Sequence, residues 1–288
     1  MIRILRPPFR RSLCCALVAW MAAAATAEAP ATASKDPATL VAAARRLAAS
    51  ARPEDQAELR RRLESAEFLT RLDEPARYQG APQGLRLSEV LGELSRNRAP
   101  TAEATLVALT RSRVFRAEPL RAELLIRACV PLRPPSPDVV RFWDEHWQRD
   151  DGYSHVTAGA VCDNGTAPAL ALLERKMADP THPDDDKRVW IVTGIMMHRN
   201  DVPMLESCER MLRSGLPARL RPLLVEAIFD YRPTEWFRPA TVLVPPDRAL
   251  ASPAARERLR RLGEYALKSV PLTEAQKNAV TGVLNGLK

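Results

Sequence analysis

The residue types best suited to chemistry lie in a short acidic run that follows a histidine. His182 precedes Asp184, Asp185 and Asp186, and an imidazole and carboxylate oxygens are groups that can share a cation. The three aspartates also stand directly before a helical pattern that begins near Lys187. At that place they would accept hydrogen bonds from free N–H groups and oppose the helix dipole. Because a metal site needs further ligands from elsewhere, we favour the structural interpretation and predict no metal.

A second candidate set contains the groups used in acid–base catalysis. His146 and His155 lie on either side of a polar segment, and Asp144 comes just before the first of them. Exposed turn residues explain this set equally well. Four catalytic motifs are missing from the chain, namely Gly-x-Ser-x-Gly, Ser-x-x-Lys, His-Glu-x-x-His and a glycine-rich phosphate loop. We therefore predict that the chain is not an enzyme and uses no cofactor.

Phe142, Trp143 and Trp147 form the most unusual cluster in a chain that is only 5% aromatic. Tryptophans on a helix can line a ligand groove, and they can equally fill a core. For the set as a whole we favour the core. Trp143 remains a candidate for contact with a partner.

The elements that position these residues follow from a repeated apolar pattern. The segment ELLIRACVPLRP at 123–134 matches PLLVEAIFDYRP at 222–233, and two more copies lie between them, HVTAGAVCDNGT at 155–166 and VWIVTGIMMHRN at 189–200. One column of the aligned copies always holds a small residue, at spacings of 32, 34 and 33 residues, and Gly92 adds an earlier member. The column contains Gly92, Ala128, Ala160, Gly194 and Ala227. A small residue at a fixed helical position lets a neighbouring helix approach closely.

Each copy is followed by a polar break and a proline, which fits the first turn of a second helix. These prolines are Pro100, Pro137, Pro168 and Pro203. Each unit is therefore predicted to be two helices joined by a tight turn. The last helical column before the turn holds Leu132, Asn164, His198 and Tyr231, which we interpret as a packing position. A lone hairpin cannot bury its apolar stripe, so we expect the units to stack.

Over residues 85–237 this pattern resembles the HEAT-repeat family of α-solenoids, with a period of about 33 residues. Tetratricopeptide repeats have a similar period, but their Trp-x-x-Leu-Gly-x-x-Tyr lead helix is absent from every copy. The resemblance implies an all-α chain whose second helices line a concave groove. Some HEAT-like proteins are DNA glycosylases that use tryptophans and an aspartate on such a surface. Trp143 and Asp144 therefore leave an alternative open, in which the chain is a HEAT-like enzyme.

Residues 1–27 have the composition of a secretory signal peptide. Four arginines precede an apolar run that closes on Ala25-Thr26-Ala27, and the run is shorter than the roughly 20 residues of a membrane-spanning helix. We expect cleavage near Ala27 and a mature chain that is periplasmic or secreted, without stable membrane insertion. Arg10-Arg11 leaves the twin-arginine route open beside the general one.

Removing this leader changes the net charge of the chain. The full sequence has 43 Lys and Arg against 35 Asp and Glu, so without the four leader arginines 39 basic residues remain, a net charge of +4 instead of +8. The basic residues are scattered, with no run that would follow a phosphate backbone. No nucleic-acid partner is expected.

Three cysteines remain after the leader, Cys129, Cys162 and Cys208, and none is close to another in sequence. An odd number without short spacing implies no disulfide framework, even in an oxidising compartment. Each lies on an apolar helical face, where cysteine commonly behaves as a small buried hydrophobe. One pairing stays open.

The flanks of the repeats are predicted to be caps. Residues 28–84 contain a disordered start and an N-terminal helical cap rich in Arg and Glu, and residues 238–288 contain a proline-rich loop and a C-terminal helical cap. Within the second cap we expect helices near 252–269 and 273–286.

The second helices supply the predicted working surface. Four apolar positions recur at helical spacing and should face the core: Leu170, Leu173, Leu205 and Cys208. The positions then turned outward are Glu174, Arg175, Glu209 and Arg210, with Trp143 at about the corresponding place one unit earlier. We expect an exported, non-enzymatic scaffold that binds another protein or peptide across this row. A ladder of surface ion pairs is the simpler alternative for the same residues.

Overall fold

The computed structural model of the chain describes residues 37–73, 85–147, 154–230 and 252–287. This part of the chain is 82% helix and contains no strand, which confirms the all-α class. The predicted signal peptide, the start of the N-terminal cap and the proline-rich loop lie outside the described residues.

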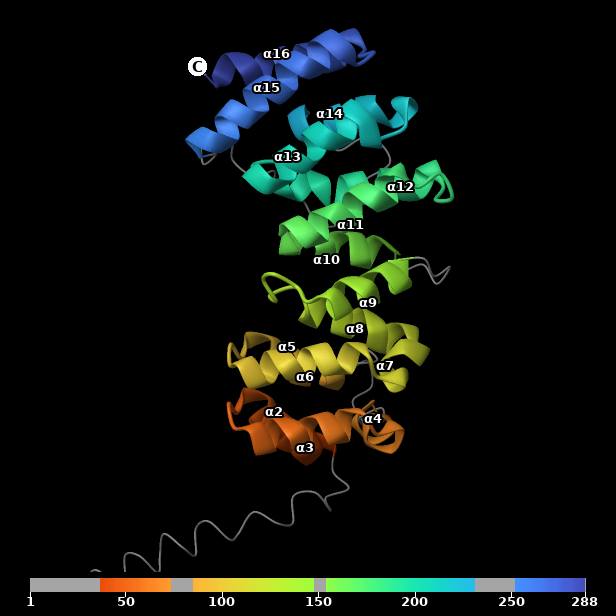
Figure 1. Ribbon diagram of the computed structural model, residues 1–288, viewed down its shortest axis with the longest axis vertical. Helices are drawn as coiled ribbons and strands as arrows, with labels where there is room; N and C mark the ends of the chain where they lie inside the picture. Colours follow the sequence, from red (N-terminus) through yellow and green to blue (C-terminus); the bar gives the residue numbers. More distant parts are fainter. Residues whose placement is uncertain (1–36, 74–84, 148–153, 231–251, 288) are drawn as a thin grey trace, which may run out of the picture.

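The helices pack in two layers, and the chain alternates between them as it runs along the long axis of the molecule (Figure 1). The first layer contains α2 (Pro37–Ala49), α5 (Leu85–Arg96), α8 (Pro119–Ala128), α10 (Ser154–Asn164), α12 (Asp184–Thr193), α14 (Arg221–Phe229) and α16 (Glu274–Gly286). The second layer contains α3 (Pro53–Leu63), α6 (Pro100–Thr110), α9 (Pro137–Trp147), α11 (Ala167–Ala178), α13 (Val202–Arg210) and α15 (Pro253–Ser269). Within each layer, every helix contacts the next one named.

Two short helices, α4 (Ala66–Asp73) and α7 (Arg113–Ala117), interrupt this alternation. The sequence predicts one continuous pattern over 52–72, but the chain restarts at Ser65, whose hydroxyl accepts from the Phe68 N–H at 3.3 Å. No pattern in the sequence predicts α7. This helix places Phe115 in the core with no exposed surface.

The prolines start the second helices, as predicted. Pro100 and Pro137 are the first residues of α6 and α9, and Pro168 and Pro203 are the second residues of α11 and α13. A first-turn residue has no intrahelical N–H bond to lose. The predicted C-terminal helices are also present as α15 and α16. Thr273 and Gln276 form a capping box at the start of α16.

The predicted column of small residues lies where first-layer helices meet. Its members in the four clear copies are buried: Ala128, Ala160, Gly194 and Ala227. The closest approach is at Gly194, where a Cβ atom would lie 2.6 Å from Cys162 Sγ and 3.0 Å from the Trp190 carbonyl oxygen. A side chain there would push α12 away from α10. The predicted packing role is confirmed at Gly194, but not at Gly92, which is half-buried and where a Cβ atom would meet only Arg96 Nη1, at 3.7 Å.

The buried apolar side chains form one cluster that runs from Leu40 to Leu287. The four apolar positions predicted to face the core do so: Leu170, Leu173, Leu205 and Cys208. Each helix therefore contributes a stripe to a shared core, which is how a hairpin too small to fold alone becomes stable in a stack.

The turns between first and second helices are joined by asparagine side chains. We call this side the turn edge; it comprises residues 50–52, 97–99, 129–136, 165–166 and 199–201 with the helix ends beside them. Asn164 donates from Nδ2 to the carbonyl oxygens of Val130 and Leu132, each at 2.8 Å. Asn97 makes the same pair of bonds to the turn before it, each at 2.9 Å.

Two arginines extend these contacts along the turn edge. Arg98 donates to the Pro131 carbonyl at 3.2 Å, and Arg133 donates to the Asp163 carbonyl at 2.7 Å. Each of the two thus reaches the turn of the next hairpin. Carbonyl groups in successive turns thus accept from neighbouring units, in exposed bonds from the arginines and in partly or fully buried bonds from the asparagines, so the turns are fixed relative to one another.

Candidate partner-binding face

Asp144 joins α9 to α11. Arg175 donates from Nη2 to one carboxylate oxygen at 2.8 Å, and the Lys176 ammonium lies 2.6 Å from the other. Lys176 is 2% exposed. A desolvated ammonium is stable only beside an opposite charge, so Asp144 acts as the counter-ion of Lys176.

Glu174 joins α11 to α13 in the same way. Arg210 donates from Nε and Nη2 at 2.7 to 3.1 Å, and the Ser207 hydroxyl donates at 2.8 Å. The forked guanidinium matches the two carboxylate oxygens. The hydrogen bond to Glu174 raises the pKa of Arg210 above its usual value.

Arg258 joins α13 to α15. Its guanidinium lies 2.6 Å from a Glu206 oxygen and 3.3 Å from a Glu209 oxygen. Glu209 also pairs with Arg213 at 2.9 Å, and the Arg213 guanidinium lies over the Tyr265 ring, 4.6 Å from its centroid. A cation over an aromatic face adds a modest attraction.

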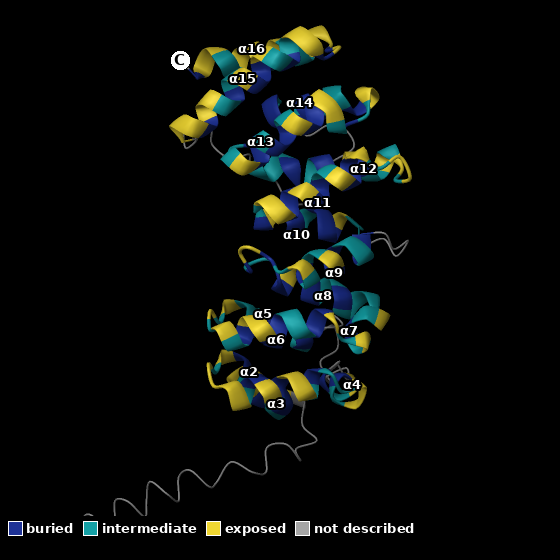
Figure 2. Ribbon diagram, in the orientation of Figure 1, coloured by how far each residue is buried: buried dark blue, intermediate teal, exposed yellow. Residues whose placement is uncertain are grey.

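These contacts define what we call the outer face, the exposed side of α9, α11, α13 and α15. Figure 2 shows exposed residues along α9, α11 and α13. Two of these pairs are asymmetric, because in Asp144–Arg175 and in Glu174–Arg210 the arginine side chain is more exposed than the carboxylate; in Glu206–Arg258 the two are similar, at 36% and 30%. Glu174 and Glu209 side chains are 23% and 17% exposed, but those of Arg175 and Arg210 are 59% and 56% exposed.

The predicted row of outward residues is only partly outward. Arg175 and Arg210 are exposed, whereas Glu174 and Glu209 are drawn into interhelical pairs. The ion-pair ladder that the sequence allowed is therefore confirmed for these residues. A role in binding a partner stays a prediction.

Trp143 does not belong to the outer face. Its side chain has no exposed surface, so the assignment of Trp143 as a partner contact is wrong for this structure. Phe142 and Trp147 are buried too, which confirms the core interpretation for the set. Successive helical residues point about 100° apart, so when Asp144 faces outward Trp143 must turn into the core.

The proposed acid–base set is not assembled. His146 is buried and packs edge-on against Phe142, with ring centroids 4.5 Å apart. His155 is exposed near the start of α10. Asp144 is occupied by Arg175 and Lys176.

The acidic run lies inside the first turn of α12, where it opposes the helix dipole as expected. The expected capping is wrong, because the N-cap residue is Pro183 and α12 has no side-chain cap hydrogen bond. Asp184, Asp185 and Asp186 form the first turn of α12, and Asp184 pairs with Arg219. His182 packs edge-on against Trp190. Among the residues that the structure describes, no group of three or more His, Cys, Asp or Glu could hold a metal ion.

A feature that the sequence analysis missed lies on the turn edge. The His198 ring bridges two carboxylates, with Nε2 2.8 Å from Asp163 Oδ1 and Nδ1 2.9 Å from Asp201 Oδ2. Burial would lower the pKa of His198, but the hydrogen bonds to both aspartates outweigh it and raise the pKa from 6.5 to about 9. The sequence predicted a packing role for this position, whereas the ring is an ionic bridge between two turns. No local pattern indicates this bridge, because Asp163 and His198 are 35 residues apart.

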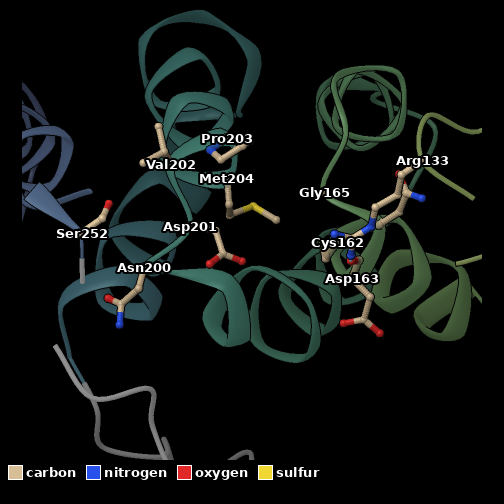
Figure 3. Close-up of a pocket in the computed structure, with 11 residues that line it drawn as sticks. Arg133, Cys162, Asp163, Gly165, Asn200, Asp201, Val202, Pro203, Met204 and Ser252 are labelled. Carbon is tan, nitrogen blue, oxygen red and sulfur yellow. The ribbon is translucent and has the colours of Figure 1, made fainter. Parts of the chain in front are cut away.

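Asp163 and Asp201 also line a cavity of about 700 Å³ between the turns (Figure 3). Arg133 lies at one end and Ser252 at the other, with Met204 between them. A cavity of this size suits a small molecule. Its lining contains two carboxylates and one arginine, and both carboxylates already contact the His198 ring, so charge alone selects neither an anion nor a cation.

The three cysteines Cys129, Cys162 and Cys208 are buried and free. Burial raises the pKa of the Cys129 thiol to about 12 and raises that of Cys162 well above its usual value. A thiol held in its protonated form is a poor nucleophile. These side chains act as small apolar residues of the core.

Comparison of the chain with protein-family models, with curated proteins and with solved structures finds no match. The resemblance to HEAT repeats therefore depends on the repeat pattern itself. None of the helices in the described ranges has the length and apolar content to cross a membrane.

Proposed function

We propose that the chain is an exported, non-enzymatic scaffold, a solenoid of HEAT-like hairpins that binds another protein or peptide across the outer face. The observation that carries this proposal is the continuous second layer, in which α9, α11, α13 and α15 present polar side chains along one surface. In a HEAT-like stack this layer would be the concave side. Arg175 and Arg210 are its exposed contacts, and Glu174 and Glu209 orient them.

The alternative of a HEAT-like enzyme acting at Trp143 and Asp144 has less support. A buried tryptophan offers no surface for stacking on a base. Asp144 is paired with Arg175 and with the buried Lys176. Freeing Asp144 for catalysis would leave the buried ammonium of Lys176 without its counter-ion, at a cost of several kcal/mol.

Export is part of the proposal, because the leader at 1–27 sets where the partner is met. Signal peptidase should cleave after Ala27, since small residues stand at Ala25 and Ala27 and Pro30 disfavours a cut after Ala29. Mass spectrometry of the purified protein from the producing cells measures the mature N-terminus. Full-length chain in the cytoplasm would contradict both the exported location and the class of partner.

Affinity capture from the envelope fraction tests the binding face. The bait is the wild-type chain beside a variant with four alanine substitutions on the outer face, at Glu174, Arg175, Glu209 and Arg210. We expect the variant to lose specific partners while keeping its thermal midpoint within a few degrees, because exposed ion pairs contribute little to stability.

A matched control removes the same number and sign of charges from the first layer. It carries alanine at Glu123, Arg127, Glu274 and Lys277, which form exposed ion pairs on α8 and α16. This variant should retain every wild-type partner. If the outer-face variant keeps all partners too, the outer face is not the binding surface.

A further inference from the structure

The outer face presents one exposed arginine on each of three consecutive second-layer helices. Arg141 on α9, Arg175 on α11 and Arg210 on α13 have side chains 65%, 59% and 56% exposed. Their carboxylate partners Asp138 and Asp144 are only 22% and 30% exposed. Each pair therefore directs its positive member outward, although each pair as a whole is neutral.

The three arginines are 34 and 35 residues apart in sequence. Arg175 and Arg210 are each the ninth residue of their helix, and Arg141 is the fifth residue of α9, about 6 Å nearer the helix start. Neighbouring helices in a packed layer lie about 8–10 Å apart, so we expect Arg175 and Arg210 to follow each other across the helices at about that spacing, with Arg141 offset by about one turn toward the start of α9. We call these three residues the arginine row. Each keeps N–H groups for a further acceptor: within the described contacts, Arg175 donates only from Nη2, and Arg210 donates only from Nε and Nη2.

We infer that the arginine row binds an extended acidic segment of the partner, with a carboxylate at about every third residue. An extended chain advances about 3.3–3.6 Å per residue, so three residues span about 10 Å, close to the helix spacing. The proposal rests on the proposed scaffold function and names the chemistry of its partner.

The carboxylates between the arginines favour a peptide over a nucleic acid. Each strand of a DNA duplex places a phosphate about every 3.4 Å along the helix axis, so a duplex lying across the row would set charges against Asp144 and Glu174 as well as against the arginines. A peptide can place neutral residues at those points. A row of arginines separated by carboxylates therefore favours a peptide whose own carboxylates are separated by neutral residues.

Fluorescence anisotropy with labelled peptides tests the proposal on the purified full chain. The main probe is a repeated Glu-Gly-Ser peptide, which spaces its carboxylates by three residues. A second peptide of the same composition groups its glutamates together, and a third replaces Glu with Lys. We expect the spaced peptide to bind most tightly, to weaken as salt rises, and the lysine peptide not to bind.

The matched variants replace arginines of similar exposure with glutamine. One carries R141Q, R175Q and R210Q; the control carries R96Q, R127Q and R188Q, which are 66%, 61% and 51% exposed on first-layer helices. Loss of the arginine row should weaken binding of the spaced peptide roughly tenfold or more, as the sum of three modest contacts. The control should stay within about twofold, and circular dichroism should show both variants folded.

Three results would overturn the inference: no binding of the spaced peptide, equal binding of the grouped peptide, or equal loss in both variants. Tighter binding of oligothymidylate that depends on the same arginines would show a general polyanion surface instead. These outcomes are separate from failure of the scaffold proposal. If envelope partners still depend on the outer face while the spaced peptide does not bind, the scaffold stands and the acidic partner is wrong.

Discussion

The turn edge and the outer face both connect neighbouring hairpins, but they use different chemistry. On the turn edge, Asn164 is buried and donates to two backbone carbonyl groups. On the outer face, the Glu174–Arg210 pair joins two charged side chains, one of them more than half exposed. Neighbouring hairpins are thus connected by buried hydrogen bonds on the turn edge and by ion pairs at the surface on the outer face.

The difference indicates which side carries stability and which is available for recognition. A buried carbonyl that loses its donor keeps the full desolvation cost, whereas solvent replaces a lost partner at an exposed ion pair. We therefore expect the stack to depend on the turn edge and to tolerate change on the outer face.

The largest effect is expected from Asn164→Ala. It would leave the Val130 and Leu132 carbonyls without their side-chain donor, so the free energy of unfolding should fall by about 2–4 kcal/mol. Urea unfolding followed by circular dichroism measures it. Asn278→Ala, at an exposed site on α16, is the control and should change stability by less than about 0.5 kcal/mol. Equal unfolding midpoints for the two variants would show that the stability of the fold does not depend on the turn edge.

Ala227→Leu extends the test to a buried contact away from the turns. Ala227 is 5% exposed in α14, where a larger side chain would overpack the first layer. We expect a loss of about 1–3 kcal/mol in thermal unfolding. The same substitution at the exposed Ala275 on α16 should be nearly neutral. If Ala227→Leu leaves the thermal midpoint unchanged, the column of small residues does not determine how closely the first-layer helices pack.

The features best predicted from the sequence are those that depend on a single residue type or on a regular spacing of residues along the chain. A proline fixes the start of a helix through its own ring, and Gly194 can be placed because the small residue recurs in each copy. The direction in which a side chain points is harder to predict, since an error of one residue in the register of a helix turns the side chain by about 100°. That error separates Trp143, which was expected outside, from Asp144, which is there.

The turn edge was missed for a different reason. Asn97 and Asn164 are two repeats apart, and the intervening unit has Leu132 in the same column, so no regular pattern appears. The bridge from His198 to Asp163 joins residues 35 apart, and only the folded stack brings them together. Contacts between units depend on the packing of whole helices, which local spacing does not report.

His198 tests whether an ionic contact on the turn edge behaves like its buried neighbours. The folded-state pKa of about 9 lies above the ordinary 6.5, so the bridge stabilises the fold fully below pH 6.5 and loses this contribution as pH rises through 9. Both aspartates are more than half exposed, which lowers the expected contribution to about 1–2 kcal/mol. Between about pH 6 and pH 10, wild type should lose that much more stability than H198Q. Parallel curves for the two proteins would contradict the bridge.

The smallest effect is expected on the outer face, from a double-mutant cycle of Glu174→Ala and Arg210→Ala. The pair is bidentate, but its guanidinium is 56% exposed, so the coupling free energy should be about 0–1 kcal/mol and should shrink in high salt. Chemical unfolding of wild type, both single variants and the double variant measures it. A coupling above about 2 kcal/mol would place the outer face with the turn edge as a structural element. Arg210 could then contact a partner only by losing an ion pair that stabilises the fold. Stability and recognition would in that case depend on the same residue, and the proposed difference between the turn edge and the outer face would be wrong.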